Sequence, residues 1–305
     1  MAEDNILRSY GDATRKPSVM PLIEYLTAEE TQLFNTFGKT TAIDTVHSTL
    51  LDTLDTPGSA AVAEAADYTI GATTTPTRLY NVVEVVAKPF AVSRTQQKIQ
   101  HFHGENELTR QRKKAMKNWA NAAEFDLIRS TLVSGVSGTI PKMEGLIAHI
   151  SKSTNYTAHN SGTVWSASIL KGLMKDNKDN SNGDTATDLY MGSYLKDKTD
   201  DFTNKTNNIV TGTNVRQIIN SVDVFETGLG KVAIHYHRYV QQSSDSTSRV
   251  LGLRPEKHQI AVLESTYEDT DLARSGPYDK RSITGSFTLA TTNQDSNLFS
   301  IGFLK

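Results

Sequence analysis

The segment spanning residues 40–95 most constrains the fold of this 305-residue chain. It is long and its pattern is that of extended chain, so it cannot enclose a core of its own. Residues 40–54 roughly alternate between polar and apolar side chains, and residues 78–95 are dense in β-branched side chains, a pattern that favours strands. Turn-rich residues at 55–59 and 71–76 separate the two runs. The segment therefore predicts a long two-stranded ribbon. Such a ribbon is only marginally stable alone in water, so we expect it to lie on a neighbouring subunit.

The first 39 residues predict an N-terminal arm. Only short apolar clusters occur there, and Gly11, Pro17, Pro21 and Gly38 interrupt the segment. It cannot bury enough surface to fold alone, so we expect it to lie across something else or to form a disordered leader. The first ten residues are polar and predict no signal peptide, and no window reaches the ~18 consecutive apolar residues of a membrane span.

Residues 105–133 predict the clearest helix, which would span about 43 Å at ~1.5 Å per residue. Its apolar stripe comprises Leu108, Ala115, Trp119, Ala123 and Leu127, with Met116 and Ile128 beside it. Its first half carries a basic run of Arg110, Arg112, Lys113, Lys114 and Lys117. This run would be a solvated face, an ion-pair partner for another subunit, or a contact for phosphate.

The remainder of the chain predicts an α+β arrangement. We expect helices at 165–175 and 193–202 and strands at 189–191, 222–225, 231–239 and 258–263. Two later strands, at 283–291 and 298–304, are separated by a turn and predict a C-terminal hairpin. The 37 threonines also favour extended chain and hydroxyl-rich surface.

The composition excludes several classes of protein. The 32 Lys and Arg residues against 34 Asp and Glu give a formal net charge of −2, which excludes a chain built mainly to wrap nucleic acid by bulk charge. Near-zero charge also lets many copies pack without strong self-repulsion. The absence of cysteine excludes disulfides, thiolate metal sites and a cysteine nucleophile.

Two His-x-His pairs, His101/His103 and His235/His237, are the candidates for metal ligands. In a strand, residues two apart face the same side, so either pair could hold a metal through ring nitrogens. No third or fourth ligand stands nearby at a suitable spacing. We therefore expect hydrogen-bonded histidines and no metal site.

The sequence offers no support for an enzyme. Gly38-Lys39-Thr40 resembles the end of a phosphate loop, but Leu33 stands where that motif needs a glycine. The nucleophile elbow Gly-x-Ser-x-Gly and the zinc motif His-Glu-x-x-His are both absent from the sequence. We expect no catalytic residues, no cofactor-binding residues and no cofactor.

The order of these segments resembles the major capsid proteins of tailed bacteriophages with the Hong Kong 97 fold. The stretches that carry the resemblance are 45–54 (start of the extended loop), 64–68 (acidic turn), 78–81 and 90–96 (returning strand), 104–130 (spine helix), and 271–276 with 286–289 (C-terminal signature). The resemblance covers roughly residues 40–150 and 232–305. Residues 151–221 match only by their position in the order.

The resemblance implies an α+β fold of the Hong Kong 97 type, with an N-terminal arm, a long two-stranded extended loop, a spine helix, and peripheral and axial domains. The expected boundaries are 1–39 for the arm, 40–103 for the extended loop, 104–150 for the spine helix and the start of the peripheral domain, 151–275 for the axial domain, and 276–305 for a C-terminal hairpin of the peripheral domain.

The resemblance also implies the function of a major capsid protein. Its copies would self-assemble into the icosahedral or prolate head shell that encloses phage double-stranded DNA. The implied partners are the chain itself as hexamers and pentamers, packaged DNA in non-specific contact, and scaffold, portal and decoration proteins, with no membrane. The protein would be located in the virion after assembly in the host cytoplasm. The alternatives are another virion or tail structural protein, an encapsulin-like compartment, or a metal-dependent hydrolase that uses the histidine pairs.

We expect the extended loop of one subunit to meet the spine helix of the next, because in the family this loop crosses an adjacent subunit. The expected interface residues are the acidic Asp52, Asp55, Glu64 and Asp67 of the loop, its Arg78, and the basic Arg110, Arg112, Lys113, Lys114 and Lys117 of the helix. Contact of these basic residues with DNA is the competing interpretation. We favour the ribbon, because its carboxylates supply the opposite charge.

Overall fold

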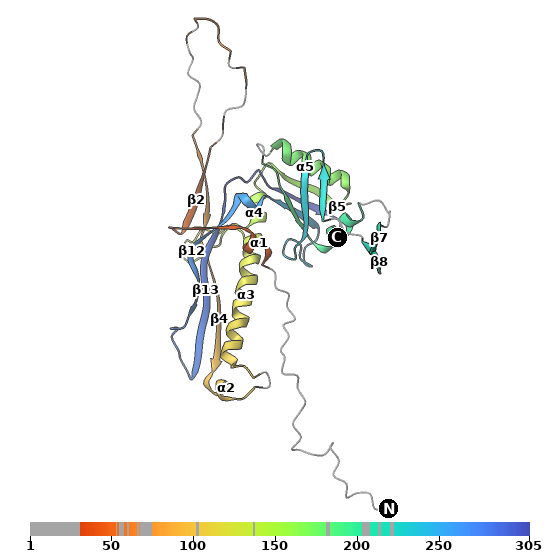
Figure 1. Ribbon diagram of the computed structural model, residues 1–305. Coiled ribbons are helices and arrows are strands. Elements are labelled where there is room, and N and C mark those ends of the chain that lie inside the picture. The colour runs from red at the N-terminus through yellow and green to blue at the C-terminus, as the bar shows by residue number, and fades with distance from the viewer. Residues whose placement is uncertain are drawn as a thin grey trace, which may run out of the picture.

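Two β-sheets, a long helix and a projecting ribbon make up the α+β fold (Figure 1). The structure is a computed structural model that describes residues 31–52, 54, 58–59, 61–65, 67, 75–101, 104–136, 138–180, 184–202, 208–212, 215–219 and 223–305. No helix in these ranges is long and apolar enough to cross a membrane.

The first sheet is four-stranded and elongated, in the order β1–β12–β13–β4. Its strands are β1 (Gly38–Thr41), β12 (His258–Asp269), β13 (Tyr278–Thr291) and β4 (Glu84–Ser93). Strand β1 runs parallel to β12, and the other neighbours are antiparallel. Helix α3 (Glu107–Arg129) lies along one face, against β4 and β13 (Figure 1).

Alternation along β4 determines where α3 packs. Val86 is buried towards the helix, whereas Val85 is 56% exposed on the opposite face. The buried Trp119 of α3 donates from Nε1 to the carbonyl oxygen of Val86 at 2.8 Å. Gly285 in β13 leaves room for the indole, because a Cβ at this position would lie 2.9 Å from a ring carbon of Trp119. A missing side chain thus lets the helix approach the sheet closely.

The second sheet is six-stranded, in the order β5–β14–β11–β6–β10–β9. Its strands are β5 (Tyr156–Thr163), β14 (Leu298–Phe303), β11 (Ser248–Leu253), β6 (Asp188–Met191), β10 (Gly230–Tyr236) and β9 (Val224–Thr227). Helices α5 (Ala167–Asn180) and α6 (Ser193–Asp200) bury Leu170, Leu173 and Leu195 against it. This cluster is a second core, separate from the one around Trp119.

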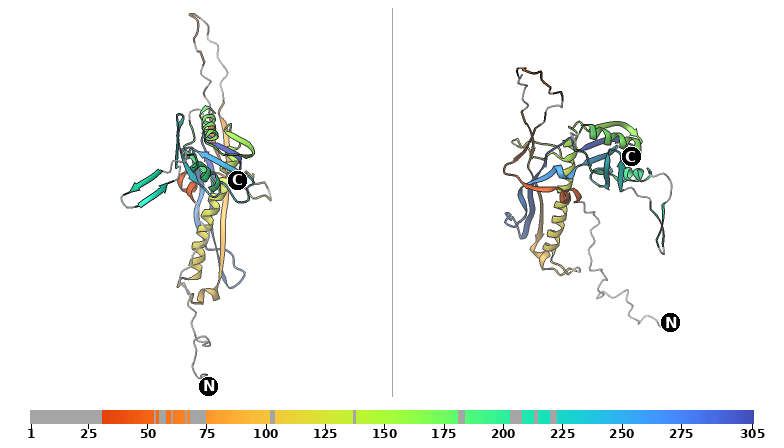
Figure 2. Two further views of the ribbon diagram at one scale, coloured as in Figure 1. Left: turned by 90° about the vertical axis from the view of Figure 1, so that its right-hand side faces the viewer. Right: turned by 45° about the horizontal axis from the view of Figure 1, so that its top comes forward.

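Two paired-strand extensions leave the body. Strands β2 (Val46–Leu51) and β3 (Thr77–Val82) form a ribbon that projects beyond one end of the four-stranded sheet (Figure 1). Strands β7 (Asn208–Gly212) and β8 (Val215–Ile219) pair at the side of the six-stranded sheet (Figure 2). The short helical elements are α1 (Gln32–Thr36), α2 (Arg94–Lys98), α4 (Leu146–Ile150) and the 3-10 turn η1 (Pro255–Lys257).

The long helix is confirmed, and its stripe is nearly as predicted. Ala115, Trp119, Ala123, Leu127 and Ile128 are buried, but Met116 is 50% exposed and so does not belong to the core. The predicted strand at 78–95 is two strands, β3 and β4, which break at Val83. Only β3 belongs to the ribbon, because β4 pairs with β13 in the body.

The predicted C-terminal hairpin at 276–305 is wrong. Strand β13 pairs with β12 and β4, whereas β14 pairs with β11 and β5 in the other sheet. The turn crosses between the sheets because side chains hold it there: Asn297 accepts from His258 Nε2 at 2.8 Å, and its carbonyl oxygen accepts from Asn177 at 3.2 Å. Likewise β12 lies in the four-stranded sheet, although the predicted axial segment, 151–275, includes it.

A buried carboxylate attaches the N-terminal end of the described chain to α3. Glu124 is fully buried and accepts from the backbone N–H groups of Leu33 and Phe34, both at 2.7 Å, where α1 begins. His237 Nε2 lies 2.9 Å from the same carboxylate. Free N–H groups at a helix N-terminus favour a negative charge, so Glu124 caps α1 from a distant element.

His258 joins the two sheets from a fully buried position. Its Nδ1 lies 3.1 Å from Thr291 Oγ1 at the end of β13, and its Nε2 lies 2.8 Å from Asn297 Oδ1 just before β14. The ring of Phe37 stacks on the imidazole at 5.1 Å. Burial lowers the pKa of His258 to about 4, so the joint is built around a neutral imidazole.

Replacing Glu124 by Gln is expected to destabilise the chain by about 2–4 kcal/mol, because a neutral amide loses the charge that His237 and the α1 N–H groups share. The free energy of unfolding in denaturant measures this loss. Glu256→Gln is the matched control, because the Glu256 side chain is 79% exposed and its ion pair is at the surface. Equal stability of both variants would contradict the assigned role of Glu124.

Acid should weaken the fold through His258. The unfolded chain takes up a proton at this ring below its ordinary pKa of 6.5, whereas the folded chain does so only near 4. The stability that His258 contributes is therefore complete above this window. It is lost as pH falls through the window, by up to about 1.4 kcal/mol per pH unit. We expect the stability difference between the natural chain and His258→Gln to narrow between about pH 7 and pH 4.

Two carboxyl groups act in the opposite direction. Burial raises the pKa of both Glu84 and Asp126, and the charge of Asp126 adds to the shift at Glu84. These groups gain stability as pH falls, so they flatten the pH profile of the natural chain. The comparison with His258→Gln removes this contribution, because both chains contain the same carboxyl groups. A pH-independent difference would show that His258 does not resist protonation.

Candidate subunit interface

The ribbon presents one apolar face to solvent. Residues that pair across β2 and β3 point to the same side, and Ser48 opposite Tyr80 alternates with His47 opposite Asn81. On the first side, Val46, Leu50 and Tyr80 are 43%, 67% and 54% exposed. Exposed apolar side chains along one face of a thin ribbon indicate a surface that binds another protein. We call Val46, Leu50 and Tyr80 the outer ribbon face.

The opposite face is held to the body at the ribbon base by Asn81. Its Nδ2 donates to the carbonyl oxygens of Glu144 at 3.0 Å and Leu289 at 2.9 Å. Its Oδ1 accepts from the N–H groups of Val82 at 2.8 Å and Glu144 at 2.7 Å. These bonds use the full hydrogen-bonding capacity of the amide. The ribbon therefore leaves the body from a fixed base.

The acidic residues expected at the ribbon tip lie on exposed chain. Asp52, Glu64 and Asp67 are exposed, and Asp55 lies outside the described residues. Leu54 and Val62 in the same region are 99% and 65% exposed. Arg78 stands opposite Leu50 within the ribbon. The tip therefore combines negative charge with apolar side chains in a single exposed region.

The basic run on α3 is partly engaged within the chain. Arg110 donates from Nε to Glu107 at 2.8 Å and lowers the pKa of Glu107 to about 2. Arg112 Nε lies 2.6 Å from Glu268 of β12, and Lys113 pairs with Glu105. Sequence reasoning missed the pair of Arg112 with Glu268, because Glu268 is distant in the chain and meets α3 only through β12.

Lys114 and Lys117 lie on the exposed side of the first half of α3. This half of the helix, next to α2, lies at the end of the molecule opposite the ribbon (Figure 1). A single chain therefore does not bring together the two groups of predicted interface residues. If they meet, they do so between copies.

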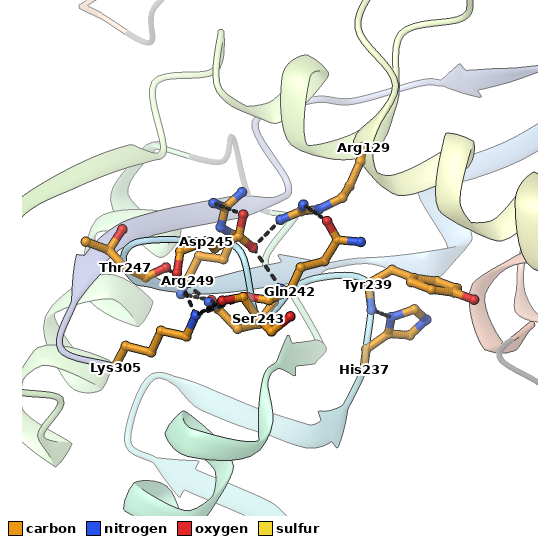
Figure 3. A network of polar contacts seen from close by, with 10 residues as sticks. Arg129, His237, Tyr239, Gln242, Ser243, Asp245, Thr247, Arg249 and Lys305 are labelled. Atoms are coloured by element: carbon orange, nitrogen blue, oxygen red, sulfur yellow. Dashed lines mark hydrogen bonds and ion pairs between the residues drawn. The ribbon is translucent and has the colours of Figure 1, made fainter. Parts of the chain in front are cut away.

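A polar network fixes the other end of α3 to the loop between β10 and β11 (Figure 3). Arg129 donates to Gln242 Oε1 at 2.6 Å and pairs with Asp245, and Arg249 lies 3.1 Å from the same carboxylate. Burial alone would raise the pKa of Asp245, but the N–H of Gln242 and both arginines hold it below its ordinary value. The network joins the helix to the six-stranded sheet.

Lys305 completes this network from the end of β14. Its ammonium group donates to the carbonyl oxygen of Asp245 at 2.7 Å and to that of Ser243 (Figure 3). The sequence pattern did not predict this cluster, because its arginines and lysine look like ordinary surface residues until the loop folds back.

The described histidines of the two pairs contact other groups of the protein. His235 Nε2 faces Asp188 at 3.1 Å, whereas His237 faces Glu124. His101 contacts the carbonyl oxygen of Gln96, and His103 lies outside the described residues. Within the described ranges, no group of three His, Asp or Glu side chains could hold a metal ion.

Comparison with family models and comparison with solved structures both find capsid proteins. The family model of the SU10 major capsid protein matches residues 6–301. Comparison with curated proteins finds no match.

The capsid of a native GTA particle matches with a TM-score of 0.71 and 11% identity, covering 97% of this chain and 98% of that one. The capsid of Myoviridae phage XM1 matches with a TM-score of 0.65 and 11% identity, covering 99% and 100%. An encapsulin complex from Synechococcus elongatus matches with a TM-score of 0.64 and 9% identity, covering 98% and 96%. The chain therefore has the Hong Kong 97-type capsid fold.

Replacing Leu50 by Asp is expected to weaken self-association at least tenfold while leaving the free energy of unfolding unchanged, because a charge on the outer ribbon face opposes its burial on another copy. Sedimentation velocity measures the association. Val164→Asp is the matched control, because Val164 is 65% exposed on a different surface. If both variants associate like the natural chain, the outer ribbon face is not an interface.

Proposed function

This chain belongs to the SU10 major capsid protein family, and on that premise we propose that the ribbon of one subunit binds across the basic half of α3 in the next. The chain forms the capsid shell of a tailed phage, and its place is in the virion capsid. Its role is structural. The proposal concerns how neighbouring copies hold one another.

The outer ribbon face is the observation that carries the proposal. The single chain leaves Val46, Leu50 and Tyr80 exposed. Asn81 holds the base of the ribbon rigidly. A rigid base presents these side chains in a defined direction, so little conformational entropy is lost when a partner covers them. Full burial of an apolar side chain is worth about 1.5–3 kcal/mol, so this face can supply most of the affinity.

Charge contributes orientation more than affinity. Asp52, Glu64 and Asp67 bear negative charge at the exposed tip, and Lys113 of α3 is 60% exposed even though it pairs with Glu105. Exposed ion pairs are typically worth about 0–1 kcal/mol each, which is less than the apolar burial. Complementary charges accelerate encounter and fix the register of the ribbon on the helix.

Each subunit carries both a ribbon and a basic half of α3, so such a contact can repeat from one subunit to the next and close into a symmetric ring. A head-to-tail contact between ribbon and helix generates rings when the rotation closes, and we propose hexamers and pentamers as those rings. Assembly in the host cytoplasm, non-specific contact with packaged DNA, and scaffold, portal and decoration proteins as partners belong to the same proposal. The basic half of α3 is the candidate surface for DNA if the ribbon does not cover it.

Reversing the charge of Lys113 and Lys114 to Glu together is expected to block or strongly weaken shell assembly at physiological salt, while the monomer keeps its unfolding free energy. The reversed charges would repel the acidic ribbon tip of the neighbour. Negative-stain microscopy and sedimentation of the expressed protein measure assembly. Lys171→Glu with Lys175→Glu is the matched control, because it makes the same change of charge at two lysines that are exposed on another helix, α5.

A charge swap makes the test specific. Asp52→Lys with Glu64→Lys should restore assembly of the Lys113→Glu, Lys114→Glu chain. Normal shells from the unswapped Lys113→Glu, Lys114→Glu chain would contradict the ribbon pairing. If those shells form but enclose less nucleic acid, the basic half of α3 contacts DNA instead. Packaged protein cargo in place of DNA would support an encapsulin-like compartment.

A further inference from the structure

A small pocket with both polar and apolar lining lies between the inner side of the ribbon base and the body. The ribbon contributes His47, Thr49 and Asn81 to its lining, and the body contributes His149 of α4 and Thr291 of β13. The space open to a water molecule is about 10 Å³. One water molecule needs about 10–15 Å³, so the pocket is at the lower limit for one and too small for anything larger.

His149, which lines this pocket, carries an unsatisfied polar atom. The side chain is 6% exposed, and its Nδ1 lies 3.7 Å from Glu144. Its Nε2 is buried and has no hydrogen-bond partner within the described part of the chain. A buried nitrogen without a partner is costly, and in folded proteins such atoms are usually satisfied by protein or by ordered water.

The neighbouring groups determine which partners remain for that nitrogen. Asn81 already makes four hydrogen bonds to backbone groups, and Thr291 Oγ1 already lies 3.1 Å from His258. His47 and Thr49 are the remaining polar residues on the inner side of the ribbon, because Tyr80, which also lines the pocket, belongs to the outer ribbon face. A water molecule that contacts the body at His149 and the ribbon at His47 or Thr49 would have the two or more partners that a buried water needs.

We propose that this pocket binds a single water molecule that bridges His149 to the ribbon, and that His149 is a positioning residue for the ribbon through this water. A metal ion does not fit, because the described residues offer no group of three suitable ligands. Asn81 fixes where the ribbon leaves the body, and the water adds a second point of attachment on the side of β2. The second attachment, on β2, adds to the rigidity that Asn81 gives the base on β3.

The test combines density with hydrogen exchange on the full chain. A high-resolution cryo-electron microscopy map of the assembled particle should show one ordered peak within hydrogen-bond distance of His149 Nε2 and of a polar ribbon atom. In the unassembled chain, His149→Phe keeps an aromatic ring at this position but removes both nitrogens. We expect the backbone amides of β2 and β3 to exchange about tenfold faster in this variant.

Two further variants separate the water from other effects of the substitution. His47→Phe leaves the contact between His149 and Glu144 intact and removes one candidate ribbon partner, whereas Thr49→Val removes the other. One of these two should reproduce the faster exchange, and combining it with His149→Phe should add nothing, because both substitutions break the same bridge. His159→Phe is the control: His159 Nε2 is also buried without a partner, but β5 is remote from the ribbon.

Several outcomes would overturn the proposal. These are an empty pocket in the map, a side chain of a neighbouring subunit in place of the peak, or additive effects of the ribbon and His149 substitutions. Unchanged ribbon exchange in His149→Phe would also overturn it. None of these outcomes depends on the pairing of ribbon and α3, because the exchange measurement uses the unassembled chain.

Discussion

Helix α3 connects the four-stranded sheet, α1 and the loop before β11, so the arrangement of these parts depends on it. Trp119 attaches it to the four-stranded sheet, Glu124 attaches it to α1 and His237, and Arg129 attaches it to the loop before β11. These three residues lie five positions apart, so they point to successive sides of the second half of the helix. The first half makes fewer such contacts and keeps its lysines exposed. The second half of the helix is thus anchored in the fold, whereas the first half has exposed basic side chains.

The local patterns of the sequence were sufficient to predict the helix and the ribbon. Apolar side chains at every third or fourth residue lie on one face of a helix, so the pattern alone predicts which face is buried. The buried residues of α3 follow this spacing. The ribbon was predicted from its alternating and β-branched runs, and β2 and β3 pair as expected. The C-terminal boundary of the ribbon was wrong because β3 and β4 follow each other in one continuous strand-like run, and only the pairing of β4 with β13 places β4 in the body.

The residues that hold the parts together could not be predicted in this way. Glu124, Asn81 and His258 are polar, so a pattern of apolar spacing gives them no weight, yet each is buried. Their burial is favourable only because N–H and carbonyl groups from distant segments surround them. The false C-terminal hairpin has the same origin: Asn297 directs the turn into the other sheet through contacts that no short stretch of sequence contains.

The exchange of strands between the two sheets has a consequence for how the protein is made. Strand β1 pairs with β12 near the end of the chain, and the six-stranded sheet needs β14 to connect β5 with β11. Neither sheet can therefore close on a ribosome-bound chain before its last strands emerge. Contacts of this long range make folding slow, and they delay the seating of the ribbon base until β13 has been made, because Asn81 donates to the carbonyl oxygen of Leu289 in that strand.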